Sequence, residues 1–178
     1  MARSQATDFL QSFRFHVKSL NRAGDFPDPL QFGSDAGING EAGFQSVTLP
    51  ELSTEAVEYR EGTFKYTKKQ PGVPTVSDVT MMRGVVKTDT DFYDWLIRGI
   101  SGGEYRCDFS IKHFAREDLP DAPSHLEYGD IPEASREYKC YNGVPIRVKP
   151  AGDLDATSSE ISMAEVDVAI EYFEIVVA

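Results

Sequence analysis

Apolar and polar residues alternate along most of the chain, which is the pattern of half-buried β-strands rather than of helices. The alternation is clear around residues 13–18, 57–60, 79–85 and 105–112. A longer run near the end, 161–173, changes parity between Met163 and Ala164, which predicts a bulge or bend. The pattern therefore predicts a mainly antiparallel β fold, a sandwich or a barrel.

Turn residues divide these strands. Asn142-Gly143 stands between two alternating runs and predicts a tight hairpin, because both turn positions favour a positive φ. Pro71-Gly72 fits a type II turn, and Pro145 predicts an edge strand or a strand start. Glycine- and proline-rich stretches at about 21–43 and 114–135 predict long loops. Because neither loop separates two strand systems, we expect a single domain over residues 1–178.

One segment, about residues 89–98, has the spacing of a helix rather than of a strand. Thr88 is a candidate N-cap, and acidic residues fill the first turn. Phe92, Trp95 and Leu96 follow at i, i+3 and i+4, so they share one face and are predicted to anchor the helix on the core.

The composition narrows the possible functions. The 178 residues include 40% apolar residues, enough for a core without disulfides or metals. With 18 basic and 29 acidic residues the net charge is −11, which argues against a protein that grips nucleic-acid phosphates or a polybasic membrane surface. No apolar run has the length of a membrane span or a secretory leader, so we expect no membrane anchor.

Residues with catalytic or metal-binding chemistry are few and scattered. Cys107 and Cys140 are too few for a disulfide framework and are predicted to be free thiols on strands. The three histidines, His16, His113 and His125, fall in separate segments. No phosphate-binding glycine loop or zinc-ligand spacing occurs. The sequence therefore gives no support for a catalytic, cofactor-binding or metal site, and we expect that the protein is not an enzyme.

Several motifs occur in a fixed order along the chain. Residues 56–62 read AVEYREG, and Pro71-Gly72 and 82–85 (MRGV) follow, leading into the acidic helix start at 88–96. Near the end, residues 145–173 contain a DLDA turn and a long strand that closes in EYF. With the opening strand at 13–17, this order resembles the tail tube proteins of contractile-tailed phages and related contractile injection systems. The resemblance covers roughly residues 9–20, 44–112 and 136–176.

The resemblance implies a β-sandwich or half-barrel subunit with one flanking helix, and a structural protein whose function lies in polymer geometry. It implies hexameric rings whose inner strands join into one β-barrel, and rings stacked into a hollow conduit for DNA or protein cargo. The implied partners are further copies of the chain, a sheath subunit, and baseplate and tail-terminator proteins. A tape measure protein or cargo would fill the lumen, and DNA would pass without specific binding. The implied location is the virion tail or injection particle, assembled in the host cytoplasm.

Ring stacking is assigned, as a hypothesis, to the hairpin region at 59–75. Its candidate contact residues are Tyr59, Arg60, Glu61, Gly62, Lys65, Lys68, Lys69, Pro71 and Gly72. Basic residues on an acidic chain fit contacts between like subunits, because complementary charges set register; a solvated surface hairpin is the simpler interpretation. The acidic excess likewise fits either a lumen that repels DNA or plain solubility.

Two alternatives stay open at this point. The first is a tube-like ring subunit of the baseplate or tail end that does not elongate, and the long loops favour it slightly. The second is a monomeric β-sandwich binding module whose long loops form a ligand site. A hydrolase has only scattered carboxylates to support it.

Overall fold

The protein is described here from a computed structural model, which describes residues 10–22, 28–30, 43–62, 65–85, 87, 89–115, 134–152, 154–157 and 159–177. The predicted loops at 21–43 and 114–135, Thr88 and His125 lie largely or wholly outside these residues. The elements are β1 (Phe15–Arg22), β2 (Phe44–Val47), β3 (Leu52–Tyr59), β4 (Lys68–Val76), β5 (Val79–Gly84), α1 (Asp91–Ile100), β6 (Cys107–His113), β7 (Arg136–Lys149), β8 (Met163–Ala169) and β9 (Tyr172–Val177). The predicted mainly antiparallel β fold is confirmed.

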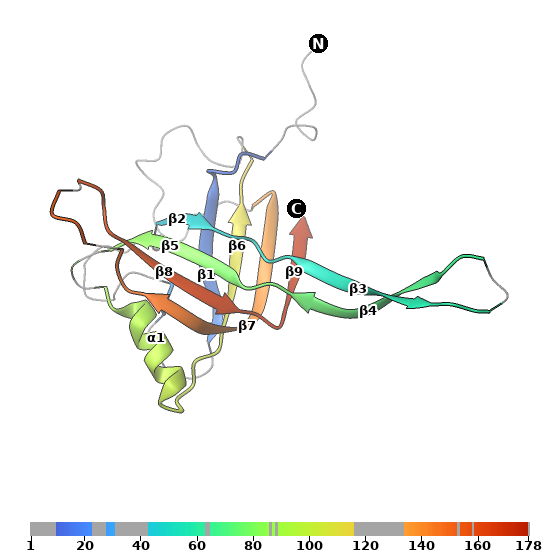
Figure 1. The fold of residues 1–178 in the computed structure, drawn as a ribbon. Helices are drawn as coiled ribbons and strands as arrows, with labels where there is room; N and C mark the ends of the chain where they lie inside the picture. Colours follow the sequence, from blue (N-terminus) through green and yellow to red (C-terminus); the bar gives the residue numbers. More distant parts are fainter. Residues whose placement is uncertain are drawn as a thin grey trace, which may run out of the picture.

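Seven strands form one hydrogen-bonded sheet that folds into two layers at β7. The order is β1-β6-β7-β8-β5-β2, and β9 also pairs with β7. One layer is therefore β1-β6-β7-β9 and the other is β7-β8-β5-β2, and Figure 1 shows the strands of the two layers crossing. Every pairing is antiparallel. The remaining two strands, β3 and β4, pair only with each other and project from the body as a long arm.

The predicted hairpin at Asn142-Gly143 is wrong, because both residues lie inside β7, a continuous strand of 14 residues. Asn142 does adopt the expected positive φ, at 55°. Here that conformation bends one strand so that its first half pairs with β6 and β9 and its second half with β8. A Cβ on Gly143 would lie 2.7 Å from the Cys107 carbonyl oxygen and 3.1 Å from Val168 Cγ1, so glycine is needed where the layers meet. Pro145 lies in the second half, whose other edge is unpaired among the described strands.

The C-terminal run also bends in a different place from the one predicted. No register shift separates Met163 from Ala164 where β8 pairs with β5. The chain turns instead at Ile170 and Glu171, between β8 and β9, and so passes from one layer to the other. Alternation along β8 buries Ala164, Val166 and Val168, as period-2 patterning requires.

The core lies between the two layers and is closed by α1. Its fully buried side chains include Val17, Met81, Phe109 and Val166. The helix begins at Asp91, two residues later than predicted, and its N-cap is Thr90. Phe92 (3% exposed) and Trp95 (1% exposed) belong to the core, whereas Leu96 is half-buried and lies outside the core cluster.

Both cysteines are free thiols on neighbouring strands, as predicted. α1 is ten residues long, and among the described residues no helix is long and apolar enough to cross a membrane.

Candidate functional site: the arm and the open sheet

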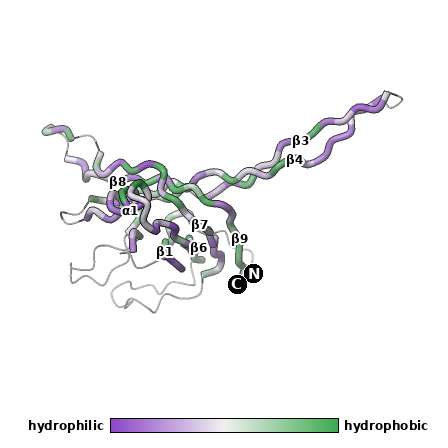
Figure 2. The backbone as a smooth tube through the Cα atoms, turned by 90° about the horizontal axis from the view of Figure 1, so that it is seen from below, coloured by the Kyte–Doolittle hydropathy of each residue, from purple (hydrophilic) through white to green (hydrophobic). Residues whose placement is uncertain are grey.

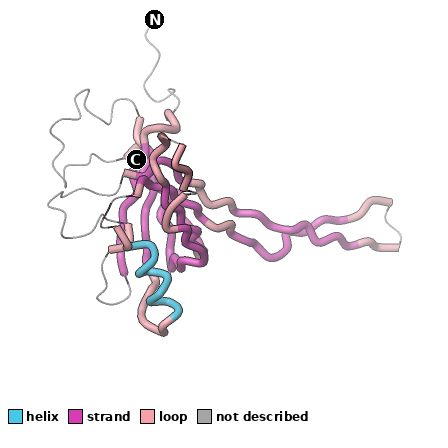
Figure 3. Tube along the Cα trace, turned by 60° about the vertical axis from the view of Figure 1, so that its left-hand side comes forward, coloured by secondary structure: helices cyan, strands magenta, loops and turns pink. Residues whose placement is uncertain are grey.

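The arm formed by β3 and β4 is exposed along its length. Figures 1 and 3 show it extending well away from the body. Its exposed apolar side chains include Leu52 (62%), Val57 (56%), Tyr59 (58%) and Val73 (78%). A two-stranded ribbon is at best marginally stable by itself, so large apolar side chains on it have the character of an unused contact surface.

The residues predicted for ring stacking all lie on this arm. Tyr59 ends β3 opposite Lys68, and Arg60, Glu61, Gly62 and Lys65 lie in the connection between the strands. Hydrophilic residues gather toward the far end of the arm (Figure 2). Residues 60–69 hold four basic residues and one acid, although the whole chain carries a net charge of −11.

Two of the predicted lysines are paired within the arm. Lys68 Nζ lies 2.9 Å from Glu61 Oε1, and Lys69 Nζ lies 3.1 Å from Glu58 Oε1. All four side chains are well exposed, and such surface pairs contribute less than about 1 kcal/mol to stability. Their charges therefore remain available to a partner.

Pro71 and Gly72 do not form the predicted turn, because both lie inside β4. Pro71 is opposite Ala56, next to a register shift between the arm strands. A proline is tolerated there because each arm strand has one unpaired edge. A Cβ on Gly72 would lie 2.8 Å from the Glu55 carbonyl oxygen, so the close approach of the strands at this irregularity requires glycine.

The layer β1-β6-β7-β9 has two open edges. β1 pairs only with β6, and β9 pairs only with β7, among the described strands. Three aliphatic residues of β9 are exposed: Ile175 (50%), Val176 (40%) and Val177 (65%). A flat, apolar, unpaired edge is a template for pairing with another chain.

The face of this layer that points away from the core is polar and balanced in charge. Cross-strand register places Lys18, Ser110, Lys139 and Glu174 in one row, and His16, Lys112, Glu137 and Val176 in the next. With Asp108, the face holds three lysines and three carboxylates. Burial, and then the charges of Lys112 and Lys18, lower the pKa of His16 to about 4, so the imidazole is neutral at pH 7.

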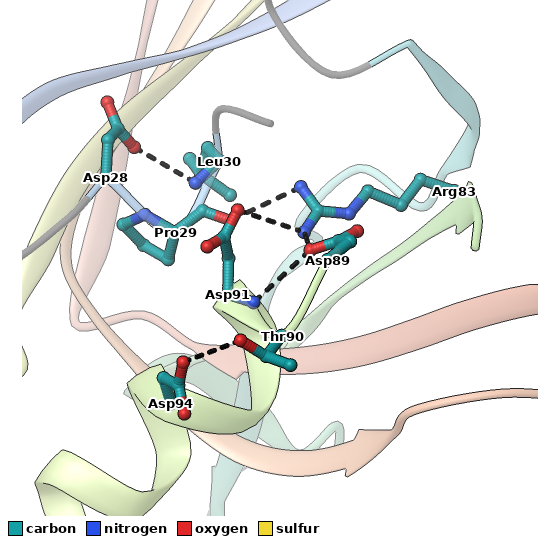
Figure 4. Close-up of polar contacts among 8 residues, drawn as sticks. All are labelled: Asp28, Pro29, Leu30, Arg83, Asp89, Thr90, Asp91 and Asp94. Atoms are coloured by element: carbon teal, nitrogen blue, oxygen red, sulfur yellow. Dashed lines mark hydrogen bonds and ion pairs between the residues drawn. The ribbon is translucent and has the colours of Figure 1, made fainter. Parts of the chain in front are cut away.

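A buried ion cluster holds α1 on the body (Figure 4). Arg83, which is 0% exposed, lies 2.5 Å from Asp89 Oδ1 and 3.7 Å from Asp91 Oδ2, and its guanidinium stacks 3.9 Å from the Phe92 ring centroid. It also donates to the Pro29 carbonyl oxygen at 3.5 Å. Burial, and then the Asp89 charge, raise the pKa of Asp91 to about 6. Sequence reasoning treated these acids only as helix-start residues and missed their shared cation.

The described residues show no catalytic constellation. Burial raises the pKa of Cys107 and of Cys140 to about 12, so neither is a nucleophile at neutral pH. His113 contacts the Gln11 carbonyl oxygen at 3.0 Å, on a different row from His16. In the described ranges no three His, Cys, Asp or Glu side chains group closely enough to hold a metal ion.

Comparisons with known proteins give one family and several similar folds. A family model described as T4-like virus tail tube protein gp19 matches residues 11–174. A chain of the PVC sheath-tube complex, an extracellular contractile injection system in the extended state, has a TM-score of 0.69 at 19% identity, covering 98% of this chain and 95% of that one. A chain of the anti-feeding prophage tube-terminating cap has a TM-score of 0.67 at 21% sequence identity, and the match covers 97% of each chain. A chain of the anti-feeding prophage baseplate has a TM-score of 0.68 at 15% sequence identity, and the match covers 96% of this chain and 97% of that one. At these identities the likeness shows the fold, and a comparison with curated proteins gave no match.

Proposed function

The chain belongs to the T4-like virus tail tube protein family, and we propose that it joins copies of itself into closed rings that stack into the hollow inner tube of a contractile tail or injection system. It is a structural protein rather than an enzyme. The observation that carries the ring proposal is the open layer β1-β6-β7-β9, whose two edges are unpaired among the described strands.

The direction of the strands allows this layer to continue from copy to copy. Because neighbours in the order β1-β6-β7-β9 are all antiparallel, β9 of one copy is also antiparallel to β1 of an identically oriented next copy. Such head-to-tail contacts close into a ring when the rotation permits. Closure removes both edges and covers the apolar residues of β9. The anti-feeding prophage baseplate neighbour is six-fold symmetrised, which supports six copies.

The arm supports stacking of the rings. Its exposed apolar and basic residues extend beyond the body, where they are able to reach a copy in an adjacent ring. We assign the axial contacts to the residues predicted for stacking: Tyr59, Arg60, Glu61, Gly62, Lys65, Lys68, Lys69, Pro71 and Gly72. The sheath subunit would pack outside the rings and the baseplate and terminator proteins at their ends, as the sheath-tube, baseplate and tube-terminating cap neighbours support. A tape measure protein or cargo would occupy the lumen, and assembly would take place in the host cytoplasm.

The experiment that tests ring formation blocks pairing at the open edge of β9. Ile175→Glu with Val177→Glu places charges on exposed side chains, so the chain should fold but should form no rings in sedimentation or negative-stain microscopy. The matched control is Leu154→Glu with Ile161→Glu, since those residues are 88% and 77% exposed on the body. Normal rings from the β9 variant would refute the edge contact. Rings that never stack, from the unchanged chain, would favour a baseplate-type subunit.

A further inference from the structure

The loop that joins β7 to β8, residues 150–162, presents apolar side chains to solvent. Among its described residues, Leu154 and Ile161 are each more than three-quarters exposed. The end of the loop is fixed to the body, because Val85 N, just after β5, donates to the Ser162 carbonyl oxygen at 2.9 Å. Single exposed apolar residues are ordinary on a protein surface, so a further observation is needed to mark a contact here.

The charge of this loop is opposite to that of the arm tip, residues 60–69. Residues 150–162 contain three acids and no basic residue, whereas the arm tip contains four basic residues and one acid. Asp155 and Glu160 are exposed acids of the loop. The backbone N–H and the hydroxyl of Thr157 donate to Asp155 Oδ1 at 2.9 and 2.8 Å and lower the pKa of Asp155, so this carboxylate stays ionised.

The β7–β8 loop and the arm tip lie on opposite sides of the body (Figures 1 and 2). A chain therefore cannot place its own arm tip on its own loop, and the two surfaces are able to meet only between copies. Such a head-to-tail contact repeats from copy to copy unless the rotation closes it. A contact that repeats in this way is what the lengthening of a stack of rings requires.

We propose that the β7–β8 loop receives the arm tip of a second copy of this chain, in the adjacent ring of the stack. Leu154 and Ile161 pack against Tyr66, which is 68% exposed in the single chain. Asp155 and Glu160 compensate the basic residues of the tip and set the register of the contact. This assignment rests on the proposed function, since it names the surface that the stacking arm contacts.

The test reverses the charge of the loop in the full-length chain. Asp155→Lys with Glu160→Lys should still form rings but no tubes in negative-stain microscopy, at concentrations where the unchanged chain forms tubes. Net charge alone would have the opposite effect, because this variant is less acidic and its copies repel each other less. The matched control, Asp78→Lys with Glu104→Lys, makes the same change at exposed acids elsewhere in the chain and should form tubes.

A combined variant tests whether the two surfaces meet. Adding Lys68→Glu and Lys69→Glu to the loop variant reverses both surfaces, so opposite charges face each other again and tubes should return. This combination keeps the net charge of the unchanged chain, −11. Its control joins the same arm substitutions to Asp78→Lys and Glu104→Lys, which gives the same net charge with mismatched surfaces and should give rings only.

An uncharged variant leaves the acids and the turn at Asp155 in place. Leu154→Ser with Ile161→Ser should raise the protein concentration at which tubes appear by roughly tenfold, because two apolar side chains lose their burial in the contact. Pelleting assays with microscopy measure this threshold, and rings should form as in the unchanged chain.

Some outcomes would overturn the loop contact and leave the proposed function in place. They are tubes at the normal threshold from either loop variant, and equal recovery of tubes in the matched and mismatched combinations. An unchanged chain that forms rings but never tubes, at any salt concentration, would overturn the proposed stacking itself and this contact with it.

Discussion

At the scale of single residues, Arg83 has the most exacting environment. Its guanidinium is fully buried, with one carboxylate at 2.5 Å, a second at 3.7 Å and an aromatic ring beneath it. A buried cation is tolerated only with such compensation, and removing one partner leaves the others buried and unpaired. Arg83 therefore joins the end of β5 to the start of α1 through charge as well as packing.

We expect Arg83→Ala to lower the free energy of unfolding by roughly 3–5 kcal/mol, because Asp89 and Asp91 would lose their buried cation. Urea denaturation of the isolated chain measures the change. Arg147→Ala is the control, since Arg147 pairs with Asp167 and Glu165 at the surface and should cost less than about 1 kcal/mol. Equal losses in the two variants would contradict the special role of Arg83.

Asp91 gives the stability a pH dependence of defined sign. Its pKa is raised to about 6 in the folded chain, against an ordinary value of 3.8 for an aspartate carboxyl. Between about pH 6 and pH 4 the folded state therefore binds a proton that the unfolded state does not, and lowering the pH adds stability from this group. His16, whose pKa is lowered to about 4, acts in the opposite direction over a similar range.

Comparison with Asp91→Asn isolates the Asp91 contribution, because His16 is common to both chains. The free energy of unfolding of the unchanged chain minus that of Asp91→Asn should increase as the pH falls from 7 to 4. Denaturant unfolding across this range measures the difference. A difference that stays constant would mean that Asp91 titrates normally.

Local sequence rules predicted residue conformation better than residue partners. The positive φ of Asn142 was predictable from the residue type, but the same conformation serves a hairpin or a bend. The choice depends on strands distant in sequence, because residues 144–149 pair with β8 rather than folding back on residues 136–141. Likewise, the acids at the start of α1, Asp89 and Asp91, were visible in the sequence, but the cation that they share, Arg83, lies on β5.

At the scale of elements, the arm and the body differ in how their strands are paired and packed. Period-2 patterning predicted β3, yet it does not distinguish a strand in a sheet from a strand in an isolated ribbon. Glycine and proline misled here, because Pro71-Gly72 lies within β4 instead of ending it. Among the described residues of the arm strands, only Val76 at the end of β4 packs against the core, so most of their sequence is free to serve contacts outside the subunit.

For the arm, we expect Lys68→Glu with Lys69→Glu to permit rings but block their elongation into tubes, because the far end becomes acidic like the rest of the chain. The subunit should still fold, since both lysines form only exposed ion pairs. Negative-stain microscopy distinguishes rings from tubes. The control is Lys87→Glu with Arg98→Glu, which makes the same charge change on the body and should leave tubes intact. Normal tubes from the arm variant would contradict the assignment of the axial contacts to the arm.

At the scale of the whole molecule, net charge should govern assembly. Each copy carries a charge of −11, and the outward face of the open layer is balanced, so most of the acidic excess lies elsewhere. Bringing copies together raises their mutual repulsion, which salt screens. The balanced face does not support the hypothesis that an acidic lumen repels DNA, if that face is the lumenal one.

We therefore expect tubes to form at lower protein concentration as the salt concentration rises from about 0.01 to 0.15 M, where the screening length falls from about 30 to 8 Å. Pelleting assays with microscopy measure this threshold. Assembly that weakens with added salt would show that attractive ion pairs, including those of the arm, outweigh the net repulsion.

The sequence alone predicted the fold class and the family through ordered motifs, but not the layer arrangement. Which strands lie at open edges depends on pairings between distant segments, such as β1 with β6 and β5 with β8.

The shared strand β7 has a mechanical consequence. Because its two halves belong to different layers, a pull along one layer is passed to the other through the covalent backbone around Asn142 rather than through side-chain packing. Its hydrogen bonds to β6, β8 and β9 are then loaded together in shear and do not open one by one. A subunit built in this way suits a conduit that must stay rigid while its surroundings exert force along it.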